Sequence, residues 1–401
     1  MAYRMASDPG YPIIDADTHV TEPPDLWQKH LPKKLREAGP RVIDGKHGGQ
    51  AWAIANGTTM AVTRLVNTAG VAPTDWDLIP KDGYASMRSG GWDPADRIRD
   101  MDIDMVDIHL IFPSYGFIVC DADDQDLYIA NIRAYNDWLA DFCSYAPDRL
   151  YGFGILPSSG VDDAIAEATR VREKHNMRSV VLRTWPNGGL IARHAVDDRF
   201  WSAAEDLDVG VACHVGFNIT GKGKKEGFDD PEVLMAMATL PFINQEKLAV
   251  DAMPVASELI LGGVLERHPR LRFGLIEVGV AWVPFFLEQS NDNYMRHRFW
   301  TKTHLPMPPS EYWARQCFAS FQVDTYGIAN RDRVGIDTIM WTSDYPHAGS
   351  DWPYARERIT AHLGEVPEDE RRKILCSNAA RWFGIESEVA NFAKQSAAVS
   401  A

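Results

Sequence analysis

The chain has 401 residues, 45% hydrophobic and 24% charged, which is enough for one large α/β barrel or two ordinary domains. Its 56 acidic and 41 basic residues give a formal net charge of -15, which argues against binding to nucleic acid or to an anionic membrane. The five cysteines show no Cys-x-x-Cys spacing and the first residues lack the apolar core of a signal peptide, so we expect free thiols in the cytoplasm.

Short apolar runs rich in β-formers alternate with helical patterns along the chain, as in βα units that build a parallel sheet. The periodicity predicts helices over 123–145, 161–175 and 198–207 and a long helical region over 231–268. Eight strands are predicted, over 13–17, 106–112, 150–156, 179–183, 210–215, 271–277, 317–323 and 338–343. Eight is the number that closes a TIM (β/α)8 barrel, so we predict an α/β barrel formed as a single domain by residues 1–401.

Two segments depart from this alternation. Residues 38–92 are rich in Gly, Asn, Thr and Trp without a strong helical period. We expect them to form an insertion after the first strand, a small hairpin and loop that covers the barrel mouth as a lid. The last dozen residues are small and polar, and we expect this C-terminal tail to fray.

The first predicted strand ends in side chains that can bind a metal. Asp15, Asp17 and His19 alternate along it and therefore share one face. If that face points into the barrel, Asp17 and His19 can reach one cation at the rim, and Glu22 follows on the next loop. The alternative is that Asp17 or Thr18 caps a helix that starts near residues 23–24.

The fifth and sixth strands each end in a candidate ligand. His214 closes an apolar run, where a rim ligand would lie, although a core histidine satisfied by hydrogen bonds fits the same position. Glu277 follows a run that should be buried, and a buried carboxylate requires a metal, a cation or a proton. The alternative for Glu277 is an ion pair with an arginine.

The eighth strand ends in Asp344, which can bind a metal and accept a proton, and His347 follows on the loop as a ligand, a substrate contact or a cap. Arg183 ends the fourth strand and can hold a substrate carboxylate as a fork or form a salt bridge. Trp185 and Trp282 occupy positions near the rim, where they can line an apolar substrate pocket or simply pack.

With these residues laid out, the chain resembles the amidohydrolase superfamily. Within it, the resemblance is to the amidohydrolase-related branch of aminocarboxymuconate-semialdehyde decarboxylase and γ-resorcylate decarboxylase. It runs in order from about residue 13 to residue 384 and is carried by the opening Asp-x-His and by 96–102, 147–152, 213–216, 266–269, 341–347 and 378–384. It implies a (β/α)8 barrel with one divalent metal at its C-terminal face.

Carried over by position, the resemblance implies that Asp17, His19, His214 and Asp344 are the metal ligands. Two positions depart from the usual pattern of the branch. The first pair is Asp-x-His where His-x-His or Glu-x-His is common, and Glu277 stands where the decarboxylases usually have a histidine as general acid and base. The metal site is compatible with these changes, but the exact reaction does not follow from them.

Three functions fit these residues. The first is a metal-dependent hydrolase or decarboxylase (a carbon–carbon lyase) acting on a small carboxylate, aromatic or unsaturated. Asp344 would be its proton shuttle, and Glu277 would orient water or protonate carbon. The second is a dinuclear Fe or Mn oxygenase that hydroxylates a small acid, because four carboxylates and three imidazoles are many for one ion. The third is a non-catalytic partner subunit.

Zinc is the first expectation for the metal, with manganese or iron as alternatives and one or two ions per chain. The small-molecule substrate is the expected partner, and the resemblance implies a homo-oligomer, most simply a dimer. No nucleic acid or membrane partner is expected, given the acidic charge.

Overall fold

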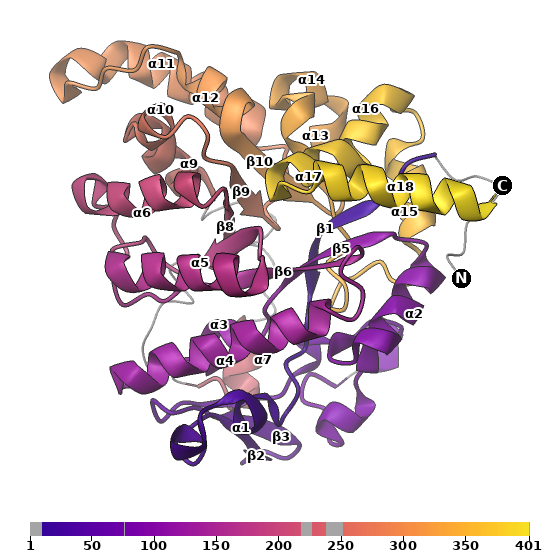
Figure 1. The fold of residues 1–401 in the computed structure, drawn as a ribbon. Coiled ribbons are helices and arrows are strands. Elements are labelled where there is room, and N and C mark those ends of the chain that lie inside the picture. The colour runs from indigo at the N-terminus through magenta and orange to yellow at the C-terminus, as the bar shows by residue number, and fades with distance from the viewer. Residues whose placement is uncertain (1–9, 76, 218–226, 238–251, 401) are drawn as a thin grey trace.

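The structure is a computed structural model that describes residues 10–75, 77–217, 227–237 and 252–400. Eight parallel strands are hydrogen-bonded in the order β1-β5-β6-β7-β8-β9-β10-β11 and curve into a nearly closed barrel with helices around it (Figure 1). The strands are β1 (Ile14–His19), β5 (Ile108–Phe112), β6 (Leu150–Ile155), β7 (Ser179–Leu182), β8 (Gly210–His214), β9 (Phe273–Ile276), β10 (Cys317–Phe321) and β11 (Ile339–Trp341). The prediction of a TIM barrel is therefore confirmed.

The strands form where they were predicted because their side chains are buried on both faces of the sheet. Every residue of β1, β5, β7, β8, β9, β10 and β11 is buried, as is typical of a parallel sheet covered by helices. Such strands are continuous apolar runs, which is the signal by which the sequence predicted them.

The longer helices cover the outside of the barrel. They are α2 (Pro94–Asp104), α4 (Gln125–Cys143), α5 (Val161–His175), α6 (His194–Asp206), α9 (Ala252–Leu261), α11 (Val283–Thr301), α12 (Pro309–Gln316), α15 (Ala355–Leu363) and α18 (Glu386–Ser400). Short helices complete the connections: α1 (Leu26–His30), α3 (Gly116–Val119), α7 (Pro231–Met237), α10 (Val264–Arg267), α13 (Thr325–Ala329), α14 (Arg331–Val334), α16 (Glu368–Arg372) and α17 (Asn378–Phe383). In the part of the chain that the structure describes, no helix is long and apolar enough to cross a membrane.

Three predicted helices correspond to α4, α5 and α6, although α6 begins four residues before the predicted start. The helical region predicted over 231–268 contains α7, α9 and α10, and its residues 238–251 lie outside the described residues. α9 and α10 are separate because Gly263 takes a φ of +73°, a left-handed conformation that ends a helix.

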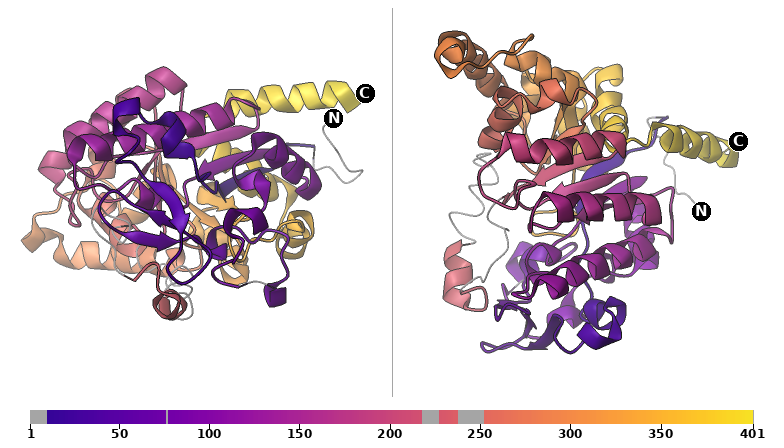
Figure 2. Two further views of the ribbon diagram at one scale, coloured as in Figure 1. Left: turned by 90° about the horizontal axis from the view of Figure 1, so that it is seen from below. Right: turned by 60° about the vertical axis from the view of Figure 1, so that its left-hand side comes forward.

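Between β1 and α2 lies a small antiparallel sheet of three strands, one more than the hairpin expected for 38–92. Its strands are β2 (Arg41–Asp44), β3 (Gln50–Ala53) and β4 (Thr59–Ala61). The N–H of Ala61 donates to the carbonyl of Phe228, which places the segment before α7 beside this sheet (Figure 2). Further along the insertion, Thr68 donates its N–H to the carbonyl of Pro346 over 2.8 Å. The insertion therefore contacts the loop that follows β11.

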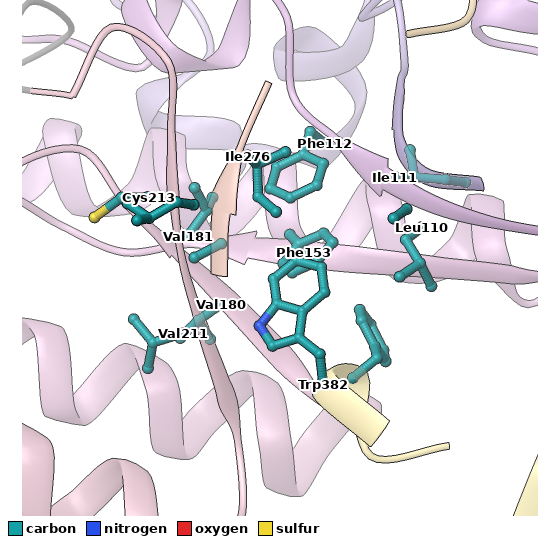
Figure 3. Close-up of a cluster of buried hydrophobic side chains, with 14 of the residues drawn as sticks. Leu110, Ile111, Phe112, Phe153, Val180, Val181, Val211, Cys213, Ile276 and Trp382 are labelled. Carbon is teal, nitrogen blue, oxygen red and sulfur yellow. The ribbon is translucent and has the colours of Figure 1, made fainter. Parts of the chain in front are cut away.

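The amino end of the barrel is filled by an aromatic side chain from α17. The Trp382 ring lies 5.2 Å from the ring of Phe153, in a buried cluster with Leu110 and Phe112 (Figure 3). Residue 274 is a glycine in β9, and a Cβ there would come within 2.3 Å of Trp382. The opposite, carboxyl end of the barrel is where the candidate site lies.

Candidate metal centre

The polar residues predicted at the strand ends converge at the carboxyl end of the barrel. One ligand atom from each of four residues lies within 4.8 Å of the others: Asp17, His19, His214 and Glu277. A second group satisfies the same criterion and shares one histidine with the first: His19, Asp344 and His347. These side chains come from β1, the end of β8 and the segments that follow β9 and β11.

The spacing of the facing atoms suits a shared cation. His19 Nε2 lies 3.1 Å from His214 Nε2, 3.3 Å from Asp17 Oδ1 and 3.4 Å from Asp344 Oδ1. His214 Nε2 lies 3.4 Å from Asp17 Oδ1 and also 3.4 Å from Glu277 Oε2. Ligands that bind one ion at about 2.1 Å are separated from each other by about 3.0–3.4 Å. The residues present therefore fit a divalent metal.

The hydrogen bonds of the two histidines also support a cation at this centre. His19 Nδ1 lies 2.9 Å from the carbonyl oxygen of Pro113, and His214 Nδ1 lies 3.2 Å from the carbonyl oxygen of Val215. A carbonyl only accepts, so each Nδ1 carries a hydrogen, and each ring in its neutral form presents an Nε2 lone pair to the centre. Two lone pairs that face each other require a proton or a cation between them.

The ionisation of these groups is strongly coupled. Burial alone would raise the pKa of Asp17, but the neighbouring imidazoles of His214 and His19 hold it below its ordinary value. Burial lowers the pKa of His214, yet the carboxylates of Asp17 and Glu277 raise it overall to about 9. Burial, with His347 next in effect, lowers the pKa of His19 to about 3. Both carboxylate oxygens of Asp17 are buried and accept no hydrogen bond from the described residues, as expected for a metal ligand.

His347 lies between Asp344 and the loop after β5. Its Nδ1 is 3.0 Å from Asp344 Oδ1 and its Nε2 is 2.7 Å from Ser114 Oγ. Its ring stacks on that of His19 with a centroid separation of 3.7 Å. Burial is the main cause that lowers the pKa of His347 to about 3. His347 is therefore placed to exchange a proton with Asp344.

Two of the acidic residues have a backbone conformation that is unusual for residues other than glycine. Glu277 has a φ of +62° and Asp344 a φ of +58°, in the left-handed region that residues other than glycine seldom adopt. Glu277 donates its N–H to Ser320 Oγ over 2.8 Å, and Asp344 donates its N–H to the carbonyl of Asp17 over 3.1 Å. Such strain concentrates at functional sites, where surrounding contacts hold it in place.

Glu22, expected among the metal ligands, lies in neither group. Its buried carboxylate accepts the backbone N–H groups of Ser114, Tyr115 and Gly116 at 2.8–3.0 Å. The backbone N–H groups at the start of α3 attract the carboxylate, so its oxygens are directed at the α3 loop. In the structure, the Glu22 carboxylate thus holds this loop through three hydrogen bonds.

The three predicted substrate contacts are placed differently from one another. Arg183 Nη1 pairs with Asp121 Oδ1 at 2.8 Å and both side chains are fully buried, which is the salt-bridge alternative. Trp282 packs on the ring of Trp313, 5.6 Å away, in the helical layer of α11 and α12. Trp185 is linked to the site indirectly. Its ring makes edge-to-face contact with Phe217, whose N–H donates to the carbonyl of His214.

Sequence reasoning missed the residues contributed by the end of β5. Ser114 contacts His347, and the rings of Phe112 and Phe117 lie 5.2 and 5.7 Å from the ring of His214. The sequence did carry a signal. Phe112 ends the second predicted strand and Ser114 follows it closely, and all strand ends of a parallel barrel meet at one face. These residues carry neither charge nor imidazole and so were not singled out.

Comparison with known proteins identifies relatives that match most of the chain. A family model described as amidohydrolase matches residues 14–385. The 2-amino-3-carboxymuconate-6-semialdehyde decarboxylase of Dictyostelium discoideum is 21% identical over 76% of this chain and 80% of its own. The γ-resorcylate decarboxylase of Rhizobium radiobacter is 24% identical over 72% of this chain and 88% of its own.

Solved structures share the fold. An amidohydrolase from Mycobacterium avium subsp. paratuberculosis K-10 superposes with a TM-score of 0.69 at 21% identity, covering 93% of this chain and 99% of its own. A dihydroxybenzoic acid decarboxylase from Polaromonas sp. JS666 was solved with manganese and 2-nitroresorcinol. It superposes with a TM-score of 0.58 at 16% identity, covering 94% of this chain and 97% of its own. The family match extends over nearly the whole barrel, and the resemblance inferred from the sequence motifs is confirmed. The chain belongs to the amidohydrolase family.

Proposed function

We propose that this protein is a divalent-metal-dependent decarboxylase that removes carbon dioxide from a small aromatic carboxylate. The observation that carries the proposal is the convergence of Asp17, His19, His214 and Glu277 within 4.8 Å of one another. Asp344 joins this group through His19, whose Nε2 lies 3.4 Å from its Oδ1. The choice of decarboxylation over hydrolysis is supported by the relatives, which are named as decarboxylases.

The proposed ligands are Asp17, His19, His214 and Asp344, which combine two imidazoles with two carboxylates. This mixed set accepts zinc, manganese or iron. Manganese is the ion bound by the Polaromonas neighbour, so we take Mn²⁺ as the first probe and Zn²⁺ as the second. Glu277 is 18% exposed at its side chain, against 0% for Asp17, so it faces the open side of the centre.

The chemistry divides between the ion and the chain. When bound, the ion supplies positive charge that polarises the substrate carboxylate or an adjacent oxygen. As the bond between the ring carbon and the carboxylate breaks, carbon dioxide leaves and the electron pair stays on the ring carbon. That carbon then takes a proton from the carboxyl group of Asp344 or Glu277. Asp344 acts as the proton shuttle, since His347 Nδ1 lies 3.0 Å from its Oδ1 and can return the proton.

The substrate would lie against aromatic side chains. Phe112 and Phe117 flank His214, and Trp185 contacts the loop after it through Phe217. These rings favour a planar, partly apolar substrate through stacking and apolar contact. We propose that the insertion covers this site as a lid, which its hydrogen bonds to the loop after β11 support. Ala348 donates its N–H to the carbonyl of Leu65, beside the bond of Thr68 to Pro346.

We also propose that the protein forms a dimer through α11. This helix exposes large apolar side chains, with Phe285 62%, Phe299 72% and Trp300 73% exposed. Neighbouring large apolar side chains left exposed on one helix, as Phe299 and Trp300 are, are typical of association surfaces. A doubled mass by light scattering that reverts in Phe299→Ser/Trp300→Ser would support this, and a monomeric wild type would refute it. The cytoplasm remains the proposed location, on the basis of the scattered cysteines.

The experiment that tests the function begins with metal content per chain after purification without chelator. The Mn²⁺-loaded protein is then assayed for carbon dioxide release from 2,6-dihydroxybenzoate and 5-carboxyvanillate, with Asp344→Asn as the matched control. One equivalent of metal and release that depends on Asp344 support the decarboxylase. Nearly two equivalents of Fe or Mn with consumption of dioxygen would replace it with the oxygenase. A chain that binds no metal would be the non-catalytic partner subunit.

A further inference from the structure

The first and last strands of the barrel meet without a regular ladder. In the order of hydrogen-bonded strands, β1 and β11 stand at the two ends of the sheet. Among the described residues, the backbone hydrogen bonds across this seam lie beyond the end of β11. Asp344 donates its N–H to the carbonyl of Asp17, and His19 donates its N–H to the carbonyl of Tyr345 over 2.6 Å. The seam is therefore also where His19 and Asp344 must be brought together.

One buried carboxylate bridges the seam. Asp15 is fully buried in β1, and its Oδ1 accepts the hydroxyl of Thr342 over 2.8 Å. The N–H of Ser343 lies 3.0 Å from Oδ1 and 3.1 Å from Oδ2 of the same carboxylate. Both partners immediately precede Asp344. No other side chain of β1 contacts this turn through so many hydrogen bonds in the described structure.

These bonds lead directly to the conformation of Asp344. The Thr342 hydroxyl lies against the Asp17 carbonyl as well as Asp15, and the N–H of Asp344 lies 3.3 Å from the Thr342 hydroxyl oxygen. With the turn held in this way, Asp344 adopts its φ of +58° and its Oδ1 lies 3.4 Å from His19 Nε2. A looser turn would let Asp344 relax to an ordinary conformation and move away from His19.

We propose that Asp15 is a positioning residue for the metal centre, which acts by clamping the Thr342–Ser343 turn and thereby fixing Asp344 against His19. The inference rests on the proposed function, because it assumes that Asp344 binds the metal. Contacts that orient a ligand in this way commonly contribute about 10- to 100-fold to metal affinity. This role predicts that a substitution of Asp15 will weaken metal binding although the Asp15 side chain does not itself contact the ion.

The test measures Mn²⁺ binding to the intact chain by calorimetry and by the electron paramagnetic resonance spectrum of the bound ion. Asp15→Asn keeps one acceptor oxygen but turns an N–H₂ donor toward the donors of Thr342 and Ser343. Thr342→Val removes the hydroxyl at nearly constant volume, and Thr342→Ser restores it. Thr338→Val is the matched control, since it removes an equally buried hydroxyl near the other end of β11, bonded to Gly335 and Trp313.

We expect Asp15→Asn and Thr342→Val to bind Mn²⁺ about 10- to 100-fold more weakly with an altered spectrum. Thr342→Ser and Thr338→Val should bind as the wild type does. If Asp15→Asn does not fold, the test is the difference in Mn²⁺ affinity and spectrum between Thr342→Val and Thr342→Ser. Unchanged affinity and spectrum in Asp15→Asn or Thr342→Val, with normal binding by the wild type, would overturn this inference alone. Absence of Mn²⁺ binding by the wild type would overturn the metal centre and the inference with it.

Discussion

The N–H of Asp344 donates a hydrogen bond to the carbonyl of Asp17 over 3.1 Å, so residues from opposite ends of the chain are joined by their backbones at the barrel rim. Both side chains then face His19 Nε2, at 3.3 and 3.4 Å. The relative position of two proposed ligands is thus determined by closure of the barrel. Disturbance of the fold at this seam should therefore affect metal binding before it affects the remaining layers.

Asp344→Asn should abolish most of the activity while leaving the fold intact. The amide cannot accept and return a proton, and a positioned acid or base contributes about 10²- to 10⁴-fold to rate. Loss of a charged ligand adds to this effect. The measurement is the rate of carbon dioxide release at saturating Mn²⁺, with circular dichroism as the control for folding. A variant that retains the wild-type rate would remove Asp344 from the mechanism.

Metal binding should stabilise the protein against heat. An ion that binds only the folded chain adds about 2.7 kcal/mol at a concentration 100 times its dissociation constant. The melting temperature of chelator-treated protein should therefore rise on addition of Mn²⁺ and fall again with excess chelator. His214→Gln should lose most of this rise, whereas His47→Gln, at an exposed position in the insertion, should keep it. An equal rise in both variants would place the ion elsewhere.

Glu22→Gln should destabilise the protein without changing its metal content. The carboxylate accepts three backbone N–H groups, and the amide replaces one acceptor oxygen with a donor. A buried hydrogen-bond group left without its partner costs about 1–3 kcal/mol. Denaturant unfolding measures the stability and elemental analysis measures the metal. Loss of metal from a variant of unchanged stability would instead make Glu22 a ligand, as its place in the sequence suggested.

Arg183→Met should lower stability by about 3–5 kcal/mol, because it removes the cation that faces the buried carboxylate of Asp121. Arg183→Met/Asp121→Asn should recover part of the loss, since it also removes the buried charge. Chemical denaturation of the two variants and the wild type measures both effects. If Arg183→Met keeps its stability and only raises KM, the arginine is a substrate ligand.

Asp104 should make stability decrease as pH rises. Burial raises the pKa of its carboxyl from an ordinary value of 3.8 to about 7, although the N–H of Ala355 bonded to Oδ1 opposes this. Because the folded pKa is the higher one, the contribution is complete below about pH 4 and is lost as pH rises through about 7.

The slope from one such group is at most about 1.4 kcal/mol per pH unit. The free energy of unfolding should therefore decrease less steeply between pH 4 and about pH 8 in Asp104→Asn than in the wild type. Asp148→Asn, at an exposed position, is the control and should follow the wild type. A pH profile of Asp104→Asn identical to that of the wild type would contradict the raised pKa.

Most of the barrel could be predicted because its strands are coded locally. β6, for example, was predicted over 150–156 and spans Leu150–Ile155, a run buried except for the half-buried Tyr151 and bounded by polar and turn residues. Their places at predicted strand ends also identified His19 and His214 as candidate ligands, and their Nε2 atoms lie 3.1 Å apart in the structure. In a parallel barrel, the ends of separate strands meet at one face, so strand order alone implies their proximity. The third strand of the insertion sheet was missed because residues 59–61 form a run too short for a pattern.

The amino-acid sequence by itself determined the family, the eight strands and the set of polar side chains at their carboxyl ends, because these depend on local apolar patterns and motif order. Only the tertiary structure decided how those polar groups are paired. Arg183 pairs with Asp121, and the Glu22 carboxylate accepts N–H groups of the α3 loop. The Asp15 carboxylate accepts hydrogen bonds from the turn before Asp344. Each pairing depends on distances and directions between segments far apart in the chain, and no periodicity within a single segment encodes them.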